Sequence, residues 1–149
     1  MKLLGSLLII FASVFSSFFY EMGLKEVIKN TEALCDLIKH IKAKIEYFSL
    51  PIKDILNEYS KENEFIKNLI DNNFEFNKAS LDKEVINEVK AFFNSIGKGY
   101  KKEQISLCEY TESILIASKE RLKEEFPKKK KLFQALSLFF GVGCVILLI

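Results

Sequence analysis

The stretch LCDLIKHIKAKIEYFSLPIKDIL, residues 34–56, decides the fold class. Its apolar side chains recur three and four residues apart, which is the spacing of one helix face, and lysines fall between them. Pro51 ends this helix because the residue before a proline avoids helical dihedral angles, and the same proline suits the first turn of a second helix. The stripe of the first helix consists of Leu34, Leu37, Ile38, Ile41, Ile45 and Phe48.

Helical spacing continues through the rest of the middle of the chain, and no segment shows the alternation of a strand. We expect Asn72 and Asn73 to stop a short helix, and Ser80 to be the N-cap of the next one. Gly97 should close that helix, and Pro127 should interrupt the last one with a kink. The sequence predicts an all-α fold, an antiparallel bundle of five or six helices. The expected helices after Pro51 cover about 52–59, 65–70, 80–96 and 101–126.

Two segments near the ends of the chain lack charged side chains. Leu3–Tyr20 and Leu132–Ile149 are each 18 residues long and rich in Leu, Ile and Phe. A helix rises 1.5 Å per residue, so each segment reaches about 27 Å, close to the hydrocarbon thickness of roughly 30 Å. We therefore predict transmembrane helices at 3–20 and 132–149 on either side of a helical domain at 21–131.

Four lysines, Lys128–Lys131, directly precede the second charge-free segment. Lysines beside a membrane span favour the cytoplasmic side, where they also meet anionic lipid. We therefore expect the central domain to be cytoplasmic. The first segment has an alternative interpretation as a cleaved secretory signal, with small residues for cleavage around 12–17. Cleavage would make the chain a secreted helical protein and would contradict the placement that the lysines favour.

The composition argues against several classes of function. Net charge is +2, near balance, whereas a nucleic-acid-binding protein would carry a clustered basic surplus. Cys35, Cys108 and Cys144 are odd in number and widely spaced, which fits neither a disulfide framework nor a zinc site. Cys35 and Cys108 are expected to fill apolar space.

No residue pattern nominates a catalytic site. His40 is the single histidine, and a general base needs an orienting partner and a cleft that the sequence does not supply. The Gly97-Lys98-Gly99 run cannot be completed to either phosphate-binding glycine motif. We expect no enzyme activity, cofactor, metal or small-molecule substrate.

Four stretches, taken in order, resemble the stage III sporulation protein AB family. They are KLLGSLLII (2–10), residues 34–56, KKKKLFQALSLFFGVGCVILLI (128–149) and, more loosely, FNSIGKGYKKEQ (93–104). The matching positions of the middle stretches include Ile45, Tyr47, Pro51, Ile52, Ile96, Gly97 and Gln104. The chain departs from the family pattern at Lys44, Leu50 and Tyr100, and at Ser137 after Leu136.

The resemblance implies a function. Members of this family belong to the channel-like complex that joins mother cell and forespore, and their cytosolic helical domain resembles the platform protein of type II secretion systems. It implies a non-enzymatic scaffold in the mother-cell membrane facing the forespore, with other membrane subunits and the complex's ATPase as partners. The alternative is another membrane-anchored interaction protein, such as a secretion platform or a division factor.

Eight residues are the candidate contacts of such a scaffold. Tyr47 and Pro51 are expected to shape the first turn between helices, and Gly97 and Gln104 the second corner. Lys128, Lys129, Lys130 and Lys131 are expected to contact the membrane.

Overall fold

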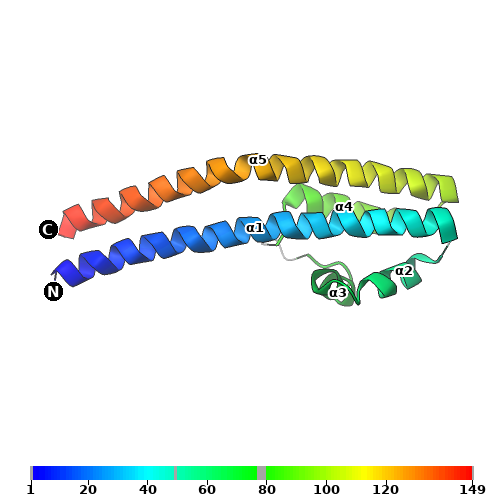
Figure 1. Cartoon of the computed structure of the whole chain (residues 1–149), viewed down its shortest axis with the longest axis horizontal. Helices are drawn as coiled ribbons and strands as arrows, with labels where there is room; N and C mark the ends of the chain where they lie inside the picture. Colours follow the sequence, from blue (N-terminus) through cyan, green and yellow to red (C-terminus); the bar gives the residue numbers. More distant parts are fainter. Residues whose placement is uncertain (1, 49, 77–79, 149) are drawn as a thin grey trace. The chain divides into compact units, whose positions relative to one another are not determined.

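The computed structural model describes residues 2–48, 50–76 and 80–148. They form five α-helices and, in these ranges, no strand, so the predicted all-α class is confirmed. Ile149, the end of the predicted second span, lies outside the described residues. The helices are α1 (Lys2–Phe48), α2 (Ile52–Tyr59), α3 (Glu64–Asp71), α4 (Lys83–Ser95) and α5 (Lys101–Leu148) (Figure 1).

The helices contribute to two compact units. Unit 1 consists of Met1–Glu26 and Leu122–Ile149, and unit 2 consists of Val27–Arg121. The 3–20 and 132–149 segments are helical, as predicted, apart from the undescribed last residue. Within the described part of the chain, no helix has a stretch both long and apolar enough to cross a membrane. That these two helices span a bilayer therefore remains a prediction.

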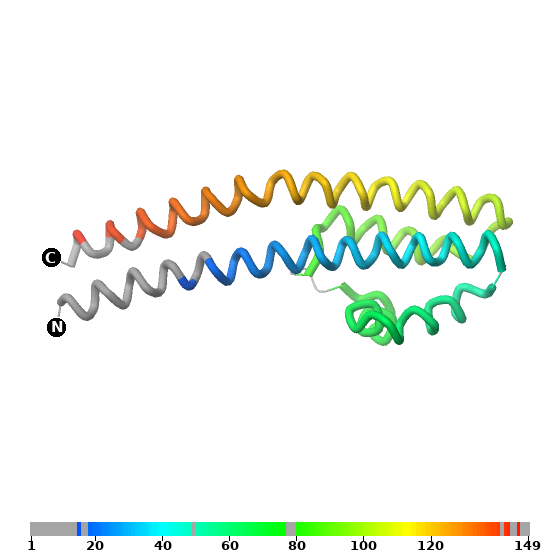
Figure 2. Tube along the Cα trace, in the orientation of Figure 1, coloured from blue at the N-terminus to red at the C-terminus, as the bar shows by residue number. Residues whose placement is uncertain are grey.

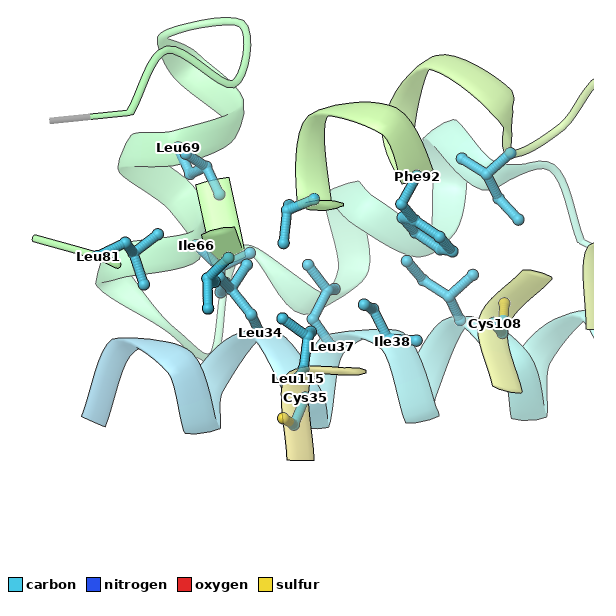
Figure 3. Packing of buried hydrophobic residues seen from close by; sticks show 14 of the residues in the cluster. Leu34, Cys35, Leu37, Ile38, Ile66, Leu69, Leu81, Phe92, Cys108 and Leu115 are labelled. Atoms are coloured by element: carbon cyan, nitrogen blue, oxygen red, sulfur yellow. The ribbon is translucent and has the colours of Figure 1, made fainter. Parts of the chain in front are cut away.

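The core of unit 2 gathers side chains from all five helices (Figure 3). Leu34, Leu37, Ile38 and Ile41 of α1 are fully buried, as their spacing predicts. Phe48 is the exception in the predicted stripe, because α1 ends there and the residue is 67% exposed. The other elements contribute Ile55, Ile66, Leu69, Leu81, Val85, Val89, Phe92, Ile96, Cys108 and Leu115.

Two ion pairs fix how α1 and α5 align within unit 2. Lys42 Nζ lies 2.9 Å from Glu109 Oε1, and Lys119 Nζ lies 3.5 Å from Glu32 Oε1. Ten residues forward along α1 thus correspond to ten residues back along α5, so the two helices are antiparallel in this unit. Exposed pairs of this kind contribute little stability, typically about 0–1 kcal/mol, and the buried stripe holds the helices together.

The start of α4 differs from the prediction. Asp82, and not Ser80, is the N-cap, since its Oδ1 accepts the Glu84 backbone N–H at 3.0 Å. Two features explain the shift. Leu81 is buried in the core, and the Ser80 carbonyl accepts the side-chain amide of Asn30 at 3.1 Å. Both place the chain before Asp82 in a non-helical conformation.

The other predicted helix boundaries agree with the structure except at Pro127. Helix α3 ends at Asp71, and Asn73 and Phe74 adopt positive φ angles of 51° and 59°. Gly97 follows α4 with a φ of +84°. Pro127, however, lies inside α5, which continues without a break to Leu148. The predicted helix end near Phe126 is therefore wrong, whereas the kink expected at Pro127, which supplies no backbone N–H to the helix, stays a prediction.

Candidate membrane-boundary and partner sites

The charged residue that follows the first apolar segment, Glu21, is the centre of an ion-pair cluster in unit 1. Lys25 Nζ lies 2.8 Å from Glu21 Oε1, one helical turn along α1. Lys130 Nζ of α5 lies 2.9 Å from the other carboxylate oxygen. Hydrogen bonds from Lys25 and Lys130 lower the pKa of Glu21 from its usual 4.5, so it stays ionised at neutral pH.

An aromatic stack lies beside this cluster. The rings of Tyr20 and Phe133 lie 4.3 Å apart, centroid to centroid, and are nearly parallel. Tyr20 ends the first charge-free segment, and Phe133 is the second residue of the other one. The stack and the Glu21–Lys130 pair therefore bring the borders of the two segments side by side within unit 1, as Figure 1 also shows.

Around and beyond these borders, unit 1 exposes many large apolar side chains among its described residues. Large exposed apolar patches are uncommon on soluble monomers and often mark contact with lipid or with another protein. The exposed residues are Phe15, Phe18, Phe19, Met22, Leu132, Leu136, Leu138, Phe139, Phe140, Val142 and Ile146.

The four lysines at 128–131 have different surroundings. Lys129 Nζ lies 2.6 Å from Glu125 Oε2, and Lys130 binds Glu21 as described. Lys128 and Lys131 are exposed and have no carboxylate within 4 Å among the described residues. From the sequence, all four lysines were expected to contact the membrane in the same way, and Glu21 was not predicted as a partner of any of them.

In unit 2, the two turns that the sequence nominated meet at one end (Figure 2). A side chain on Gly97 would lie 3.5 Å from Cγ1 of Ile52, the residue that follows Pro51. Lys101, at the start of α5, donates to the Glu46 carbonyl near the end of α1 at 2.7 Å. The structure therefore brings the Pro51 and Gly97 turns together.

Gln104 and Tyr47 are placed differently at this end. The Gln104 side-chain amide donates to the Gly99 carbonyl at 2.8 Å, which ties the turn to α5. It also lines an open hollow of about 440 Å³ together with Asn94, Ser95, Lys98, Gly99, Glu103 and Leu107. The Tyr47 side chain is 74% exposed, so it projects into solvent.

Tyr47 belongs to an exposed group that we call the aromatic end of unit 2. Its members come from the two meeting turns, and Tyr100 is the most exposed of them at 82%. Sequence analysis noted Tyr100 only as a departure from the family pattern. A tyrosine directly after the glycine turn was the feature of the sequence that could have indicated an exposed contact residue here. The aromatic end consists of Tyr47, Phe48, Leu50 and Tyr100.

The model of the stage III sporulation protein AB family matches the chain over residues 2–73 and 66–149. These two overlapping matches leave only Met1 uncovered. The chain belongs to the stage III sporulation protein AB family. No curated protein and no solved structure matches it significantly.

Three of the positions where the chain departs from the stage III sporulation protein AB pattern can be located in the structure, and the Lys44 side chain makes a contact there. Lys44 pairs with Glu58 of α2 at 2.8 Å, and this hydrogen bond lowers the pKa of Glu58 from its usual 4.5. Leu50 is not the capping position: the N-cap of α2 is Pro51, whose side chain has no hydrogen-bonding atom, so α2 begins without a side-chain cap. At the third position, Tyr100, the side chain is exposed and the backbone N–H donates to Glu103 Oε2 at 3.0 Å.

The histidine and the two described cysteines pack against other side chains in unit 2. The His40 ring packs 5.1 Å from the Tyr59 ring, and its buried Nε2 has no hydrogen-bond partner among the described residues. Burial raises the pKa of the Cys35 thiol and raises that of Cys108 to about 11, so both are thiols at neutral pH. In the described ranges, no three His, Cys, Asp or Glu side chains gather as a metal-binding group.

The α1–α5 alignment also separates the two buried cysteines. Given the Glu32–Lys119 pair, Cys35 lies opposite residue 116 of α5. Cys108 is eight residues from that point, or about 12 Å along the helix. A disulfide needs Cα atoms within about 7 Å, so Cys35 and Cys108 act as separate core residues.

Proposed function

We propose that this protein is a non-enzymatic, membrane-anchored assembly subunit of the channel complex that joins mother cell and forespore during endospore formation. Its membership of the stage III sporulation protein AB family supports the role in sporulation. The observation that carries the membrane anchor is the Glu21–Lys130 pair, which aligns the borders of two exposed apolar segments.

The physical argument for the anchor is the cost of leaving unit 1 in water. Exposed Phe and Leu side chains each gain roughly 1.5–3 kcal/mol when they leave water for an apolar environment. A bilayer offers that environment to both helices at once. The ion pair and the Tyr20–Phe133 stack then lie where an interface is expected, since charged groups and tyrosine prefer the headgroup level.

In this proposal the lysine run lies on the mother-cell cytoplasmic side. Lysines next to a membrane helix favour that side and meet anionic lipid there. Unit 2 is then a cytosolic helical domain, comparable in role to the platform protein of a type II secretion system.

We assign protein contacts to the aromatic end of unit 2. Exposed tyrosines at the centre of an interface often contribute much of its binding energy. Tyr47 and Tyr100 lie beside turns that Lys101 links through its hydrogen bond to the Glu46 carbonyl, so a partner would meet a preformed surface. The proposed partner is another membrane subunit of the complex or its ATPase, and no small molecule or nucleic acid is included.

The anchor and its sidedness can be tested together in sporulating cells. We expect the full-length chain, including Met1, to stay in the membrane after a carbonate wash. In a cysteine-free background, Tyr110→Cys of unit 2 should react with an impermeant maleimide only after the cells are opened. Reaction in intact cells, or a mature protein that starts after about residue 17, would contradict the cytoplasmic placement and favour the signal-peptide alternative.

The partner surface needs a matched control. A photo-crosslinking amino acid at Tyr47 or Tyr100 should capture a membrane subunit or the ATPase of the sporulation complex, identified by mass spectrometry. Tyr110 is a suitable control because it is also an exposed tyrosine of unit 2, on the middle of α5. Equal capture from position 110, or a sporulating strain unaffected by deletion of the gene, would refute the proposal.

A further inference from the structure

Lys128–Lys131 occupy four consecutive positions of α5, and consecutive helical residues point in directions about 100° apart. A run of four therefore surrounds the helix and cannot present all of its ammonium groups to the same surface. The ion pairs show which lysine faces which neighbour.

Two of the four ammonium groups are already bound to carboxylates. Lys130 faces α1, where Glu21 lies 2.9 Å away. Lys129 faces back along α5 to Glu125 at 2.6 Å. In each case the carboxylate already balances the charge of the ammonium group, which weakens its attraction for a further anion.

The other two lysines present a different surface. Lys128 and Lys131 are three residues apart, which places them on neighbouring positions of one helix face, turned away from the direction of Lys130. Both are exposed, and neither has a carboxylate within 4 Å among the described residues. They lie directly before Leu132, the start of the exposed apolar segment of α5.

We propose that Lys128 and Lys131 form the lipid-binding pair of the run and bind the phosphates of anionic phospholipid headgroups. Lys129 and Lys130, in contrast, stabilise unit 1 through their ion pairs. This inference rests on the proposed membrane anchor. The charge complementarity is direct, because two uncompensated ammonium groups beside an apolar segment match phosphodiester groups at the surface of a bilayer.

The test compares two double variants that remove the same charge. The full-length chain is reconstituted into phosphatidylcholine vesicles that contain a minor share of phosphatidylglycerol. The affinities of spin-labelled phosphatidylglycerol and phosphatidylcholine for the protein are then compared by electron paramagnetic resonance. Lys128→Gln with Lys131→Gln should reduce the preference for phosphatidylglycerol, by up to about fivefold per lysine. Lys129→Gln with Lys130→Gln should preserve it.

Three outcomes would overturn the assignment. The first is an equal loss of the preference for phosphatidylglycerol in both double variants, and the second is a loss only in the variant that lacks Lys129 and Lys130. The third is a wild-type protein with no preference for phosphatidylglycerol, which would favour an acidic protein as the partner of the run. Lys130→Gln also removes the ion pair with Glu21. The single variants Lys128→Gln and Lys129→Gln therefore repeat the comparison and leave the Glu21–Lys130 pair intact. Flotation with phosphatidylcholine vesicles tests the anchor separately. A chain that fails to float refutes the anchor, whereas one that floats without lipid preference refutes only the lysine assignment.

Discussion

The ammonium group of Lys130 on α5 lies 2.9 Å from the carboxylate of Glu21 on α1, and Lys25 binds the other oxygen of the same carboxylate. One acidic side chain thus joins two helices at the border of their apolar segments. Because the hydrogen bonds from both lysines lower the pKa of Glu21, this junction depends on pH in a defined direction.

The stabilisation by Glu21 should be lost in acid. A carboxylate whose pKa is lowered in the folded state contributes fully above its usual value of 4.5, and the contribution disappears as the pH falls through the lowered pKa. Spin labels at Met22→Cys and Gln134→Cys, in a cysteine-free background, would report the separation of the two helices of unit 1. We expect a narrow distance distribution at neutral pH that broadens below pH 4.5.

Glu21→Gln is the matched control for this pH dependence. It keeps the size of the side chain and removes the charge, so the distribution should be broad at neutral pH and should no longer change with acid. A distribution in the Glu21→Gln variant as narrow as that of the wild type would show that the ion pair does not hold the helices.

Phe92 and Phe48 form a second test, because both carry a phenyl ring on a helix of unit 2. Phe92 is 1% exposed and contacts the Phe93 ring edge-on, so Phe92→Ala should cost about 3–5 kcal/mol of unfolding free energy. Phe48 is 67% exposed, and its ring has Lys44 Nζ at 5.5 Å. Phe48→Ala should cost at most about 0.5–1 kcal/mol.

Urea unfolding of the full-length chain in detergent, followed by circular dichroism, measures both changes. A Phe48→Ala loss as large as that of Phe92→Ala would mean that the apolar stripe of α1 continues to its last turn, as its periodicity predicts.

These two phenylalanines also show what the sequence could and could not predict. Helical spacing identified the buried face of α1 from Leu34 to Ile45, because burial against neighbours is what selects that spacing. The same spacing included Phe48, since periodicity does not show where packing partners end. At α4, both Ser80 and Asp82 are good capping residues, and two long-range features decide between them: the burial of Leu81 and the hydrogen bond from Asn30 to the Ser80 carbonyl.

The candidate sites divide in the same way. Proline and glycine identified the Pro51 and Gly97 turns of unit 2 from local chemistry alone. That the two turns meet, and that Lys130 selects Glu21, depend on how distant helices align, which no local pattern contains. For Glu21, the available signal was its position: it borders one charge-free segment, as the lysine run borders the other.

Gly97 should not tolerate a side chain well, for conformational reasons. Its φ of +84° is unfavourable for L-residues, whereas the space beside it is adequate, with Ile52 at an ordinary contact distance. Gly97→Ala should therefore cost about 1–2 kcal/mol of stability. Gly97→Asn should cost less, because asparagine enters this region more readily.

Gly23, in the middle of α1, is the opposite case and the control. A Cβ atom there would meet nothing within 4 Å. Gly23→Ala should raise stability by about 0.5–1 kcal/mol, since alanine is the better helix former. Thermal unfolding in detergent compares the variants, and a neutral Gly97→Ala would show that the turn relaxes into another conformation.

The buried thiols should react slowly and only as the structure opens. The pKa of Cys108 is about 11, so roughly one thiol in a thousand is ionised at about pH 8, and burial also raises the pKa of Cys35. In a Cys144→Ser background, we expect almost no reaction with Ellman's reagent in the folded protein and two equivalents in denaturant. The rate in the folded protein should rise as the pH approaches 11. Rapid reaction of Cys35 or Cys108 at neutral pH without denaturant would show that α1 and α5 separate readily in unit 2, against the packing described above.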